Sequence, residues 1–236
     1  FEGAAVLAPE DFTVGAITKA PQGGSLISGA NKLLYVPEGV EIKVRPGDKV
    51  YAGQQLSDGE LNMAELVPLV GIGEGRRLLT ERFRSILRAS NADTLRRNVE
   101  SLARAFVSKA RITAPEGYNG QLIGDVVNYD QLAAAWQPRE GASELPVNNT
   151  LAGRYLEKPV LHYSIGTRLT PPLLRQLQAQ GVNKVVAHPE PPPFEPVMTP
   201  ARSFINDDED FIVAMSGEHL SRTLQDKVSR GSSART

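Results

Sequence analysis

Arginine side chains are concentrated in one stretch of this 236-residue chain. From residue 76 to residue 111 the basic residues are Arg76, Arg77, Arg82, Arg84, Arg88, Arg96, Arg97, Arg104, Lys109 and Arg111. Such density could follow the phosphates of double-stranded DNA, which would give salt-dependent and largely sequence-independent binding. The same arginines could instead form a solvated face that pairs with Glu74, Glu81, Glu100 or a partner. We favour contact with other protein subunits and keep double-stranded DNA as the alternative.

A proline run near the end of the chain is a second candidate contact site. Pro191, Pro192 and Pro193 precede Phe194, and the stretch 189–196 must run extended because proline blocks helix and donates no backbone hydrogen bond. An extended proline segment could dock into an aromatic groove of a partner. It could also act as a stiff spacer, which is the interpretation we favour.

Side chains for catalysis or metal binding have no recognisable spacing. The histidines are His162, His188 and His219, and no two stand three or four residues apart; the chain has no cysteine. The acids of residues 207–210 are consecutive and lack a glycine turn, so we expect them to complement the dipole of a following helix. We therefore expect no catalytic residue, no cofactor, no metal site and no enzymatic activity of the chain on its own.

Closely spaced glycines occur at Gly71, Gly73 and Gly75. Such glycines let backbone N–H groups approach a phosphate, but this run lacks the Lys-Ser/Thr ending and lies between helical segments rather than after a strand. It is therefore predicted to be a turn between two helices. No Gly-x-Ser-x-Gly sequence is present to mark a nucleophilic serine.

The overall charge is close to neutral. Lys and Arg number 26 against 27 Asp and Glu, a formal net charge of -1, so any contact with nucleic acid must be local. No run approaches the roughly 20 apolar residues of a membrane span, and no membrane contact is expected. The chain starts at Phe1 without an initiator methionine, so we expect it to begin inside a longer gene product or after a cleavage.

A small β-rich unit is predicted for about residues 16–59, where short apolar runs are separated by Gly and Pro. Residues 40–44 alternate between apolar and polar, which predicts a strand with one packed face. A turn is predicted at Pro46, Gly47 and Asp48.

Two helices are predicted within residues 62–109, because apolar residues recur there at steps of three and four. In the first helix they are Leu78, Leu79, Phe83, Ile86 and Leu87, and in the second Leu95, Val99, Leu102, Ala103 and Phe106. The intervening residues 91–94 favour a helix cap, so the pair predicts an antiparallel hairpin.

Shorter elements follow the hairpin. Strands are predicted at 111–115 and 121–127, and a short helix at 129–136. Further on, a strand at 160–165, a helix at 170–180 capped by Thr170 and a strand at 184–187 form a βαβ-like pattern. A last helix is predicted at 209–228, before a loose tail.

These elements predict an α+β fold in four parts. Residues 1–136 form a β unit plus the helical hairpin, and residues 137–157, which are polar and rich in turn formers, form a flexible linker. Residues 158–196 form a small α/β unit with a proline-rich exit. Residues 197–236 form the C-terminal helix and tail.

The stretch Lys43-Val-Arg-Pro-Gly-Asp-Lys-Val-Tyr-Ala-Gly-Gln-Gln-Leu-Ser-Asp-Gly59 resembles the segment of the bacterial RNA polymerase β′ subunit that leads into the jaw. That family has Gly-Asp-x-Val, Ala-Gly and Leu-Thr/Ser-Asp-Gly in this order. Later matches include Glu65-Leu66, Gly71, Leu78-Leu79, Val99-Glu100 and Pro196-Val197-Met198. The resemblance covers roughly residues 36–136 and 195–230, and it implies a jaw-like architecture for the β unit and the hairpin.

Two departures from the family bear on function. The aspartate triad that holds the catalytic Mg²⁺ in β′ has no counterpart, so nucleotidyl transfer is not expected from this chain alone. Where the family has Ser-Phe-Gln-Glu-Thr-Thr near DNA, this chain has Ser216-Gly-Glu-His-Leu-Ser-Arg-Thr223. We therefore expect a non-catalytic structural module of a large phage assembly, in the virion head or portal region, found in the virion or the host cytoplasm. The alternative is a segment of a divergent multisubunit DNA-directed RNA polymerase that contacts downstream DNA.

Overall fold

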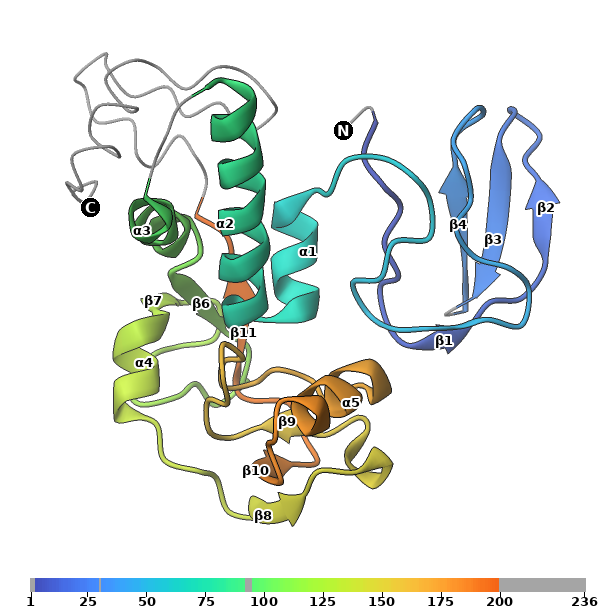
Figure 1. The fold of residues 1–236 in the computed structure, drawn as a ribbon. Helices are drawn as coiled ribbons and strands as arrows, with labels where there is room; N and C mark the ends of the chain where they lie inside the picture. Colours follow the sequence, from blue (N-terminus) through green and yellow to red (C-terminus); the bar gives the residue numbers. More distant parts are fainter. Residues whose placement is uncertain (1–2, 30, 92–94, 200–236) are drawn as a thin grey trace. The chain divides into compact units, whose positions relative to one another are not determined.

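The chain has an α+β fold divided into two compact units, as the sequence predicts for its class. The computed structural model describes residues 3–29, 31–91 and 95–199. Unit 1 is Phe1–Val70 and unit 2 is Gly71–Thr236, and both are drawn in Figure 1. The predicted C-terminal helix at 209–228 and the tail lie outside the described residues. No helix in the described ranges is long and apolar enough to cross a membrane.

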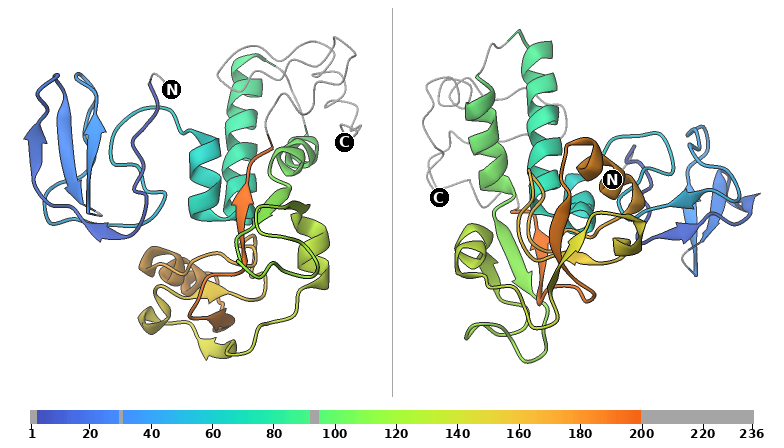
Figure 2. Two further views of the ribbon diagram at one scale, coloured as in Figure 1. Left: turned by 180° about the vertical axis from the view of Figure 1, so that it is seen from behind. Right: turned by 60° about the horizontal axis from the view of Figure 1, so that its bottom comes forward.

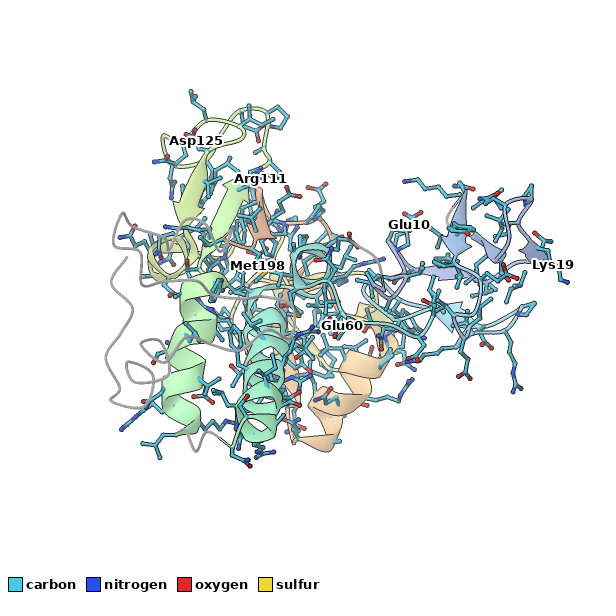
Figure 3. All side chains as sticks on the ribbon, turned by 90° about the horizontal axis from the view of Figure 1, so that it is seen from above. Glu10, Lys19, Glu60, Arg111, Asp125 and Met198 are labelled. Atoms are coloured by element: carbon cyan, nitrogen blue, oxygen red, sulfur yellow. The ribbon has the colours of Figure 1, made fainter. Side chains whose placement is uncertain are left out.

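Unit 1 is built on an antiparallel three-stranded sheet with the order β2-β3-β4, formed by Ile17–Lys19, Ser25–Gly29 and Lys32–Val36. Figure 2 shows this meander in two views, and Figure 3 marks Lys19 on its first strand. A second pair joins β1 (Phe12–Thr13) to β5 (Lys49–Val50). The unit ends with helix α1, Met63–Val70.

The core of unit 1 takes one residue from almost every segment. It consists of Ala8, Val14, Ile27, Val36, Val44, Val50 and Leu56. Because these residues cover one another, the β unit closes on itself, and this is the physical reason that the first boundary falls after Val70 and not after the predicted residue 136.

The segment 40–44 forms no strand, which corrects the prediction. It meets residues 56–58 through a single bridge between Ile42 and Ser57 and through a hydrogen bond from Lys43 N to Leu56 O at 2.9 Å. The predicted turn after it is present, because Gly47 has φ of 92° and the Asp48 carboxylate accepts from Arg45 N at 2.8 Å.

Unit 2 begins with the predicted helical hairpin. Helix α2 spans Ile72–Ala89 and α3 spans Arg96–Phe106. The two helices pack through their apolar stripes, with the ring centroids of Phe83 and Phe106 5.9 Å apart. The hairpin leads into a sheet with the order β11-β6-β7, formed by Phe194–Val197, Lys109–Ile112 and Val126–Asn128. Figure 3 labels Arg111 on β6 and Asp125 just before β7.

A second sheet in unit 2 has the order β8-β10-β9. Its strands are Ser143–Pro146, Lys184–His188 and Tyr155–Leu156, and helix α5 (Pro171–Ala179) packs over it. Helix α5 starts as predicted: Thr170 is its N-cap, with its side chain accepting from Leu173 N, and proline occupies the first turn. Helix α4 (Tyr129–Ala135) and a short 3-10 helix (Asn149–Leu151) complete the unit.

Residues 137–157 are not the flexible linker that their composition predicts. Strands β8 and β9 lie within this range, and both pair with β10, which follows about thirty residues later. Leu151 and Leu156 are buried in the core of the same sheet. Long-range pairing therefore overrides the local turn-forming composition, and the predicted α/β unit at 158–196 is continuous with the residues before it.

The predicted strand at 160–165 is also wrong. Val160 and Tyr163 instead exchange two backbone hydrogen bonds of 3.0 and 2.9 Å and enclose a tight turn. Leu161 in this turn has φ of 56°. The apolar run therefore folds back on itself, because Tyr163 enters the core beside α5.

A buried carboxylate fixes the former linker. The side chain of Glu157 is 0% exposed and accepts from Arg139 Nη2 at 2.6 Å, from Arg139 Nε at 2.9 Å and from Arg139 N at 3.1 Å. Trp136 Nε1 donates to the same carboxylate at 3.2 Å. Arg139 also donates to the carbonyls of Glu190 and Pro191 at 2.7 Å. All donors around this buried charge are thus matched.

Glu157→Gln is expected to lower the free energy of unfolding of unit 2 by about 3 kcal/mol, because an amide NH₂ would face donors and Arg139 would lose its counter-charge. Urea unfolding followed by the fluorescence of Trp136, the single tryptophan of the chain, measures this. The matched control is Glu144→Gln. Glu144 pairs with Lys184 at 3.6 Å on the surface, so this substitution should lower the free energy of unfolding by less than about 0.5 kcal/mol. Equal losses in the two variants would contradict the assignment.

Candidate binding site beside the helical hairpin

Arg76 connects three elements of unit 2. Its Nε donates to the carbonyl of Val107, at the end of α3, at 2.7 Å, and its two Nη groups donate to the Asp130 carboxylate of α4 at 3.1 to 3.2 Å. Its guanidinium also lies 5.9 Å from the ring centroid of Tyr129. Because its donors are used within the unit, Arg76 is a positioning residue and not a free contact residue.

Arg77 is held in a second network. Its Nε and Nη2 donate to Glu74 at 2.8 and 2.6 Å, and its Nη1 donates to Glu81 at 2.6 Å. His162 Nε2 lies 2.8 Å from the same Glu74 carboxylate. Burial alone would raise the pKa of Glu74, but the hydrogen bonds and charges of Arg77 and His162 outweigh burial and hold the pKa below its usual 4.5.

The other arginines of the predicted cluster fall into two groups. Arg96 pairs with Glu100 at 2.7 Å and Arg111 with Glu195 at 3.2 Å, both near the surface, and Arg82 also has an interaction partner. A second group makes no ion pair with any residue in the described part of the chain: Arg84, Arg88, Arg97 and Arg104. This second group carries the positive charge that remains available for a ligand or partner.

The available arginines share sides of their helices. Arg84 and Arg88 stand seven and eleven residues after Arg77, so they lie on the same side of α2. Arg97 and Arg104 are seven residues apart on α3 and are both exposed. The predicted arginine face therefore exists, but the fold uses Arg76 and Arg77 for its own contacts.

A pocket of about 510 Å³ lies beside the hairpin within unit 2. Its charged lining residues are Arg76, Arg77, Arg96, Glu100, Arg104 and Asp130, and the turn at 160–163 contributes Leu161, His162 and Tyr163. Tyr163 donates to Gln176 Oε1 at 3.0 Å, and burial raises the pKa of its hydroxyl to about 12. The pocket therefore combines positive charge with an apolar and aromatic wall.

The glycine run at 71–75 holds this turn against α2. Gly71, with φ of 89°, is the N-cap of the helix, in agreement with a turn between helices. Gly73 lies so close to the turn that an added Cβ would be 1.8 Å from the carbonyl oxygen of His162, and its N–H donates to Ser164 Oγ at 3.2 Å. The glycines thus serve close packing of backbone against backbone.

Part of the proline run is packed within unit 2. Pro192 and Phe194 are buried, and the Pro193 carbonyl accepts from Thr113 N at 2.9 Å. The Phe194 ring packs edge-on against Trp136, with centroids 5.5 Å apart. Arg139 and the aromatic residues therefore hold this segment against the body of unit 2, while Pro191 stays exposed.

The histidines have structural partners. His188 Nδ1 accepts from Glu190 N at 2.9 Å, and its Nε2 lies 3.1 Å from the Glu140 carbonyl, to which it donates. Within the described ranges no group of three acidic or histidine side chains could hold a metal ion. His219 and the acids at 207–210 lie outside the described residues.

Several pocket residues were missed by sequence reasoning. Asp130 and His162 carried no signal, because each meets its partner across 54 or 88 positions of the chain. Leu161 occupies a turn position with positive φ that usually has Gly or Asn, so no residue pattern indicated the turn. Only Arg104 and the other arginines were visible, as part of a charged cluster.

Known proteins match part of the chain. It is 35% identical over 95 residues to "DNA-directed RNA polymerase subunit beta'" of Chloroflexus aggregans, and 30% identical over 115 residues to the subunit of the same name of Thermodesulfovibrio yellowstonii. This chain contains a divergent β′-like region. The matches cover 40% and 47% of this chain but only 6% and 8% of those subunits. No protein-family model matches the chain.

The depressed pKa of Glu74 predicts a pH dependence of stability. Because the folded pKa is below the unfolded value near 4.5, the stabilisation is complete above that pH and is lost as the pH falls through the folded pKa. Glu74→Gln should therefore destabilise unit 2 clearly near pH 7 and much less near about pH 3. Urea unfolding followed by Trp136 fluorescence at both pH values measures the difference.

Glu81→Gln is the control for this pH experiment, because Glu81 contacts the same Arg77 but is 56% exposed. Its effect should be small at both pH values. A loss for Glu74→Gln that stays constant from neutral to acid pH would show that the carboxylate charge is not the cause.

Proposed function

We propose that this chain is a non-catalytic module of a multisubunit RNA-polymerase-like assembly, held there by contacts with other protein subunits. The observation that carries the proposal is the 35% identity over 95 residues to a DNA-directed RNA polymerase β′ subunit. These relatives favour a polymerase assembly over the predicted virion head or portal. No feature of the described residues supports a place in a virion. Its location would be that of the polymerase, in the host cytoplasm for a phage gene product.

Arginines of the hairpin that make no ion pair with a described residue form the contact surface in this proposal. Arg84, Arg88 and Arg97 can pair with carboxylates of a neighbouring subunit without loss of an existing ion pair. Arg76 and Arg77, which the sequence placed in the same set, are already paired with Asp130, Glu74 and Glu81. Their replacement would act through the fold of unit 2.

Affinity purification of the full gene product from its native cells tests this function. We expect it to copurify with chains that carry the aspartate-rich loop of a polymerase active site. Arg84→Glu combined with Arg88→Glu should reduce this copurification, whereas Arg175→Glu, on exposed α5, should not. Recovery of the protein with no polymerase chain would contradict the proposal.

A second candidate function is contact of Arg84, Arg88 and Arg97 with downstream double-stranded DNA, favoured because these three cations make no ion pair with a residue in the described part of the chain. The triple variant Arg84→Ala, Arg88→Ala and Arg97→Ala should then flatten the plot of log affinity against log salt by about 1 to 3 units of slope. The control triple is Lys158→Ala, Arg175→Ala and Lys184→Ala, outside the hairpin. If both triples change the slope equally, the hairpin is not a DNA contact.

A further inference from the structure

We propose that the pocket beside the hairpin binds a small organic anion, with Arg104 holding its carboxylate or phosphate group and Leu161 packing against its apolar body. This proposal goes beyond the polymerase module and does not depend on it. The volume of about 510 Å³ lies within the roughly 300 to 1,000 Å³ typical of small-molecule sites.

The charge of the lining selects an anion. Four guanidinium groups line the pocket against two carboxylates, those of Glu100 and Asp130. Arg76 and Arg77 are held by carboxylates and a carbonyl within unit 2, and Arg96 is engaged by Glu100. Arg104 is exposed and makes no ion pair with a residue in the described ranges. Its planar fork of donors matches the oxygens of a carboxylate or phosphate.

The apolar wall includes a residue in a strained backbone conformation. Leu161 adopts φ of 56°, a left-handed conformation that is unfavourable for a branched side chain, and its side chain is 54% exposed. The turn that carries it is fixed by the two hydrogen bonds between Val160 and Tyr163. A strained residue that exposes apolar surface to a pocket is the pattern expected of a ligand-binding wall.

Contacts with α2 and with Tyr163 also hold the turn in place. His162 contacts Glu74 at 2.8 Å, and its ring lies 4.0 Å from the ring centroid of Tyr163. The close approach of Gly73 to the His162 carbonyl leaves the turn no room to shift towards α2. The wall is therefore preformed, which reduces the entropy that a ligand must overcome.

Calorimetric titration of the full 236-residue chain tests the proposal with four probes: adenosine monophosphate, inorganic phosphate, benzoate and acetate. We expect adenosine monophosphate or benzoate to bind with a Kd below about 1 mM. The organic probe that binds should do so at least about fivefold more tightly than its counterpart without an apolar body, inorganic phosphate or acetate. Tighter binding of adenosine monophosphate assigns a phosphate ligand, and tighter binding of benzoate assigns a carboxylate. Absence of binding by all four probes overturns the proposal.

Variants separate the two parts of the site. Arg104→Ala should weaken binding at least about tenfold, and Arg175→Ala, an exposed arginine on α5, should leave it unchanged. Leu161→Gly should keep or raise Tm, because glycine accepts the positive φ, while it weakens binding of the better organic probe about threefold or more. Equal affinities for Arg104→Ala and Arg175→Ala, or full affinity of Leu161→Gly, would overturn the assignment.

Discussion

The buried Glu157 carboxylate is the constraint on which the arrangement of unit 2 depends. A charge that is 0% exposed is costly unless every oxygen has donors, and Arg139 and Trp136 supply them. Arg139 must therefore lie at one place, and from there it binds the carbonyls that lead into β11. Strand β11 pairs with β6, the strand that follows α3. One ion pair thus connects the second sheet to the base of the hairpin.

The arginines of the hairpin fall into two groups that differ in their pairing. Those near the start of α2 are bound to carboxylates from α4 and from α2 itself, and they fix the positions of the helix ends. Arg84 and Arg88 farther along α2, and Arg97 and Arg104 on α3, make no ion pair with a residue in the described part of the chain. A cluster that is uniform in composition therefore contains two kinds of arginine, and only burial and pairing distinguish them. The pocket lies where the two groups meet.

Local signals predicted the parts of the fold that are stabilised locally. The apolar periodicity of α2 and α3 and the Thr170 cap with its following proline are properties of neighbouring residues, and they were confirmed. The strand at 184–187 was predicted, but β8 and β9 were missed, because β8 pairs with β10 across the intervening 3-10 helix, β9 and α5, and β9 pairs with β10 across α5. Residues 137–157 have the composition of a linker and become ordered only through that pairing. The pocket could be foreseen only in its arginines, since Asp130, Leu161 and His162 reach it through tertiary contacts.

The pairing of β6 with β11 places Ile112 opposite Phe194. Residues 113–193 lie between these two positions in the sequence, so the chain leaves the hairpin along β6 and returns along the adjacent strand β11. Because the ends of this excursion are adjacent, and the cost of loop closure grows only slowly with length, its surface stretches can change in size at low cost. The contacts of Asp130 and His162 with α2 and the pairing of β7 with β6 constrain the rest of it, so tolerance to insertion is confined to the stretches between these contacts.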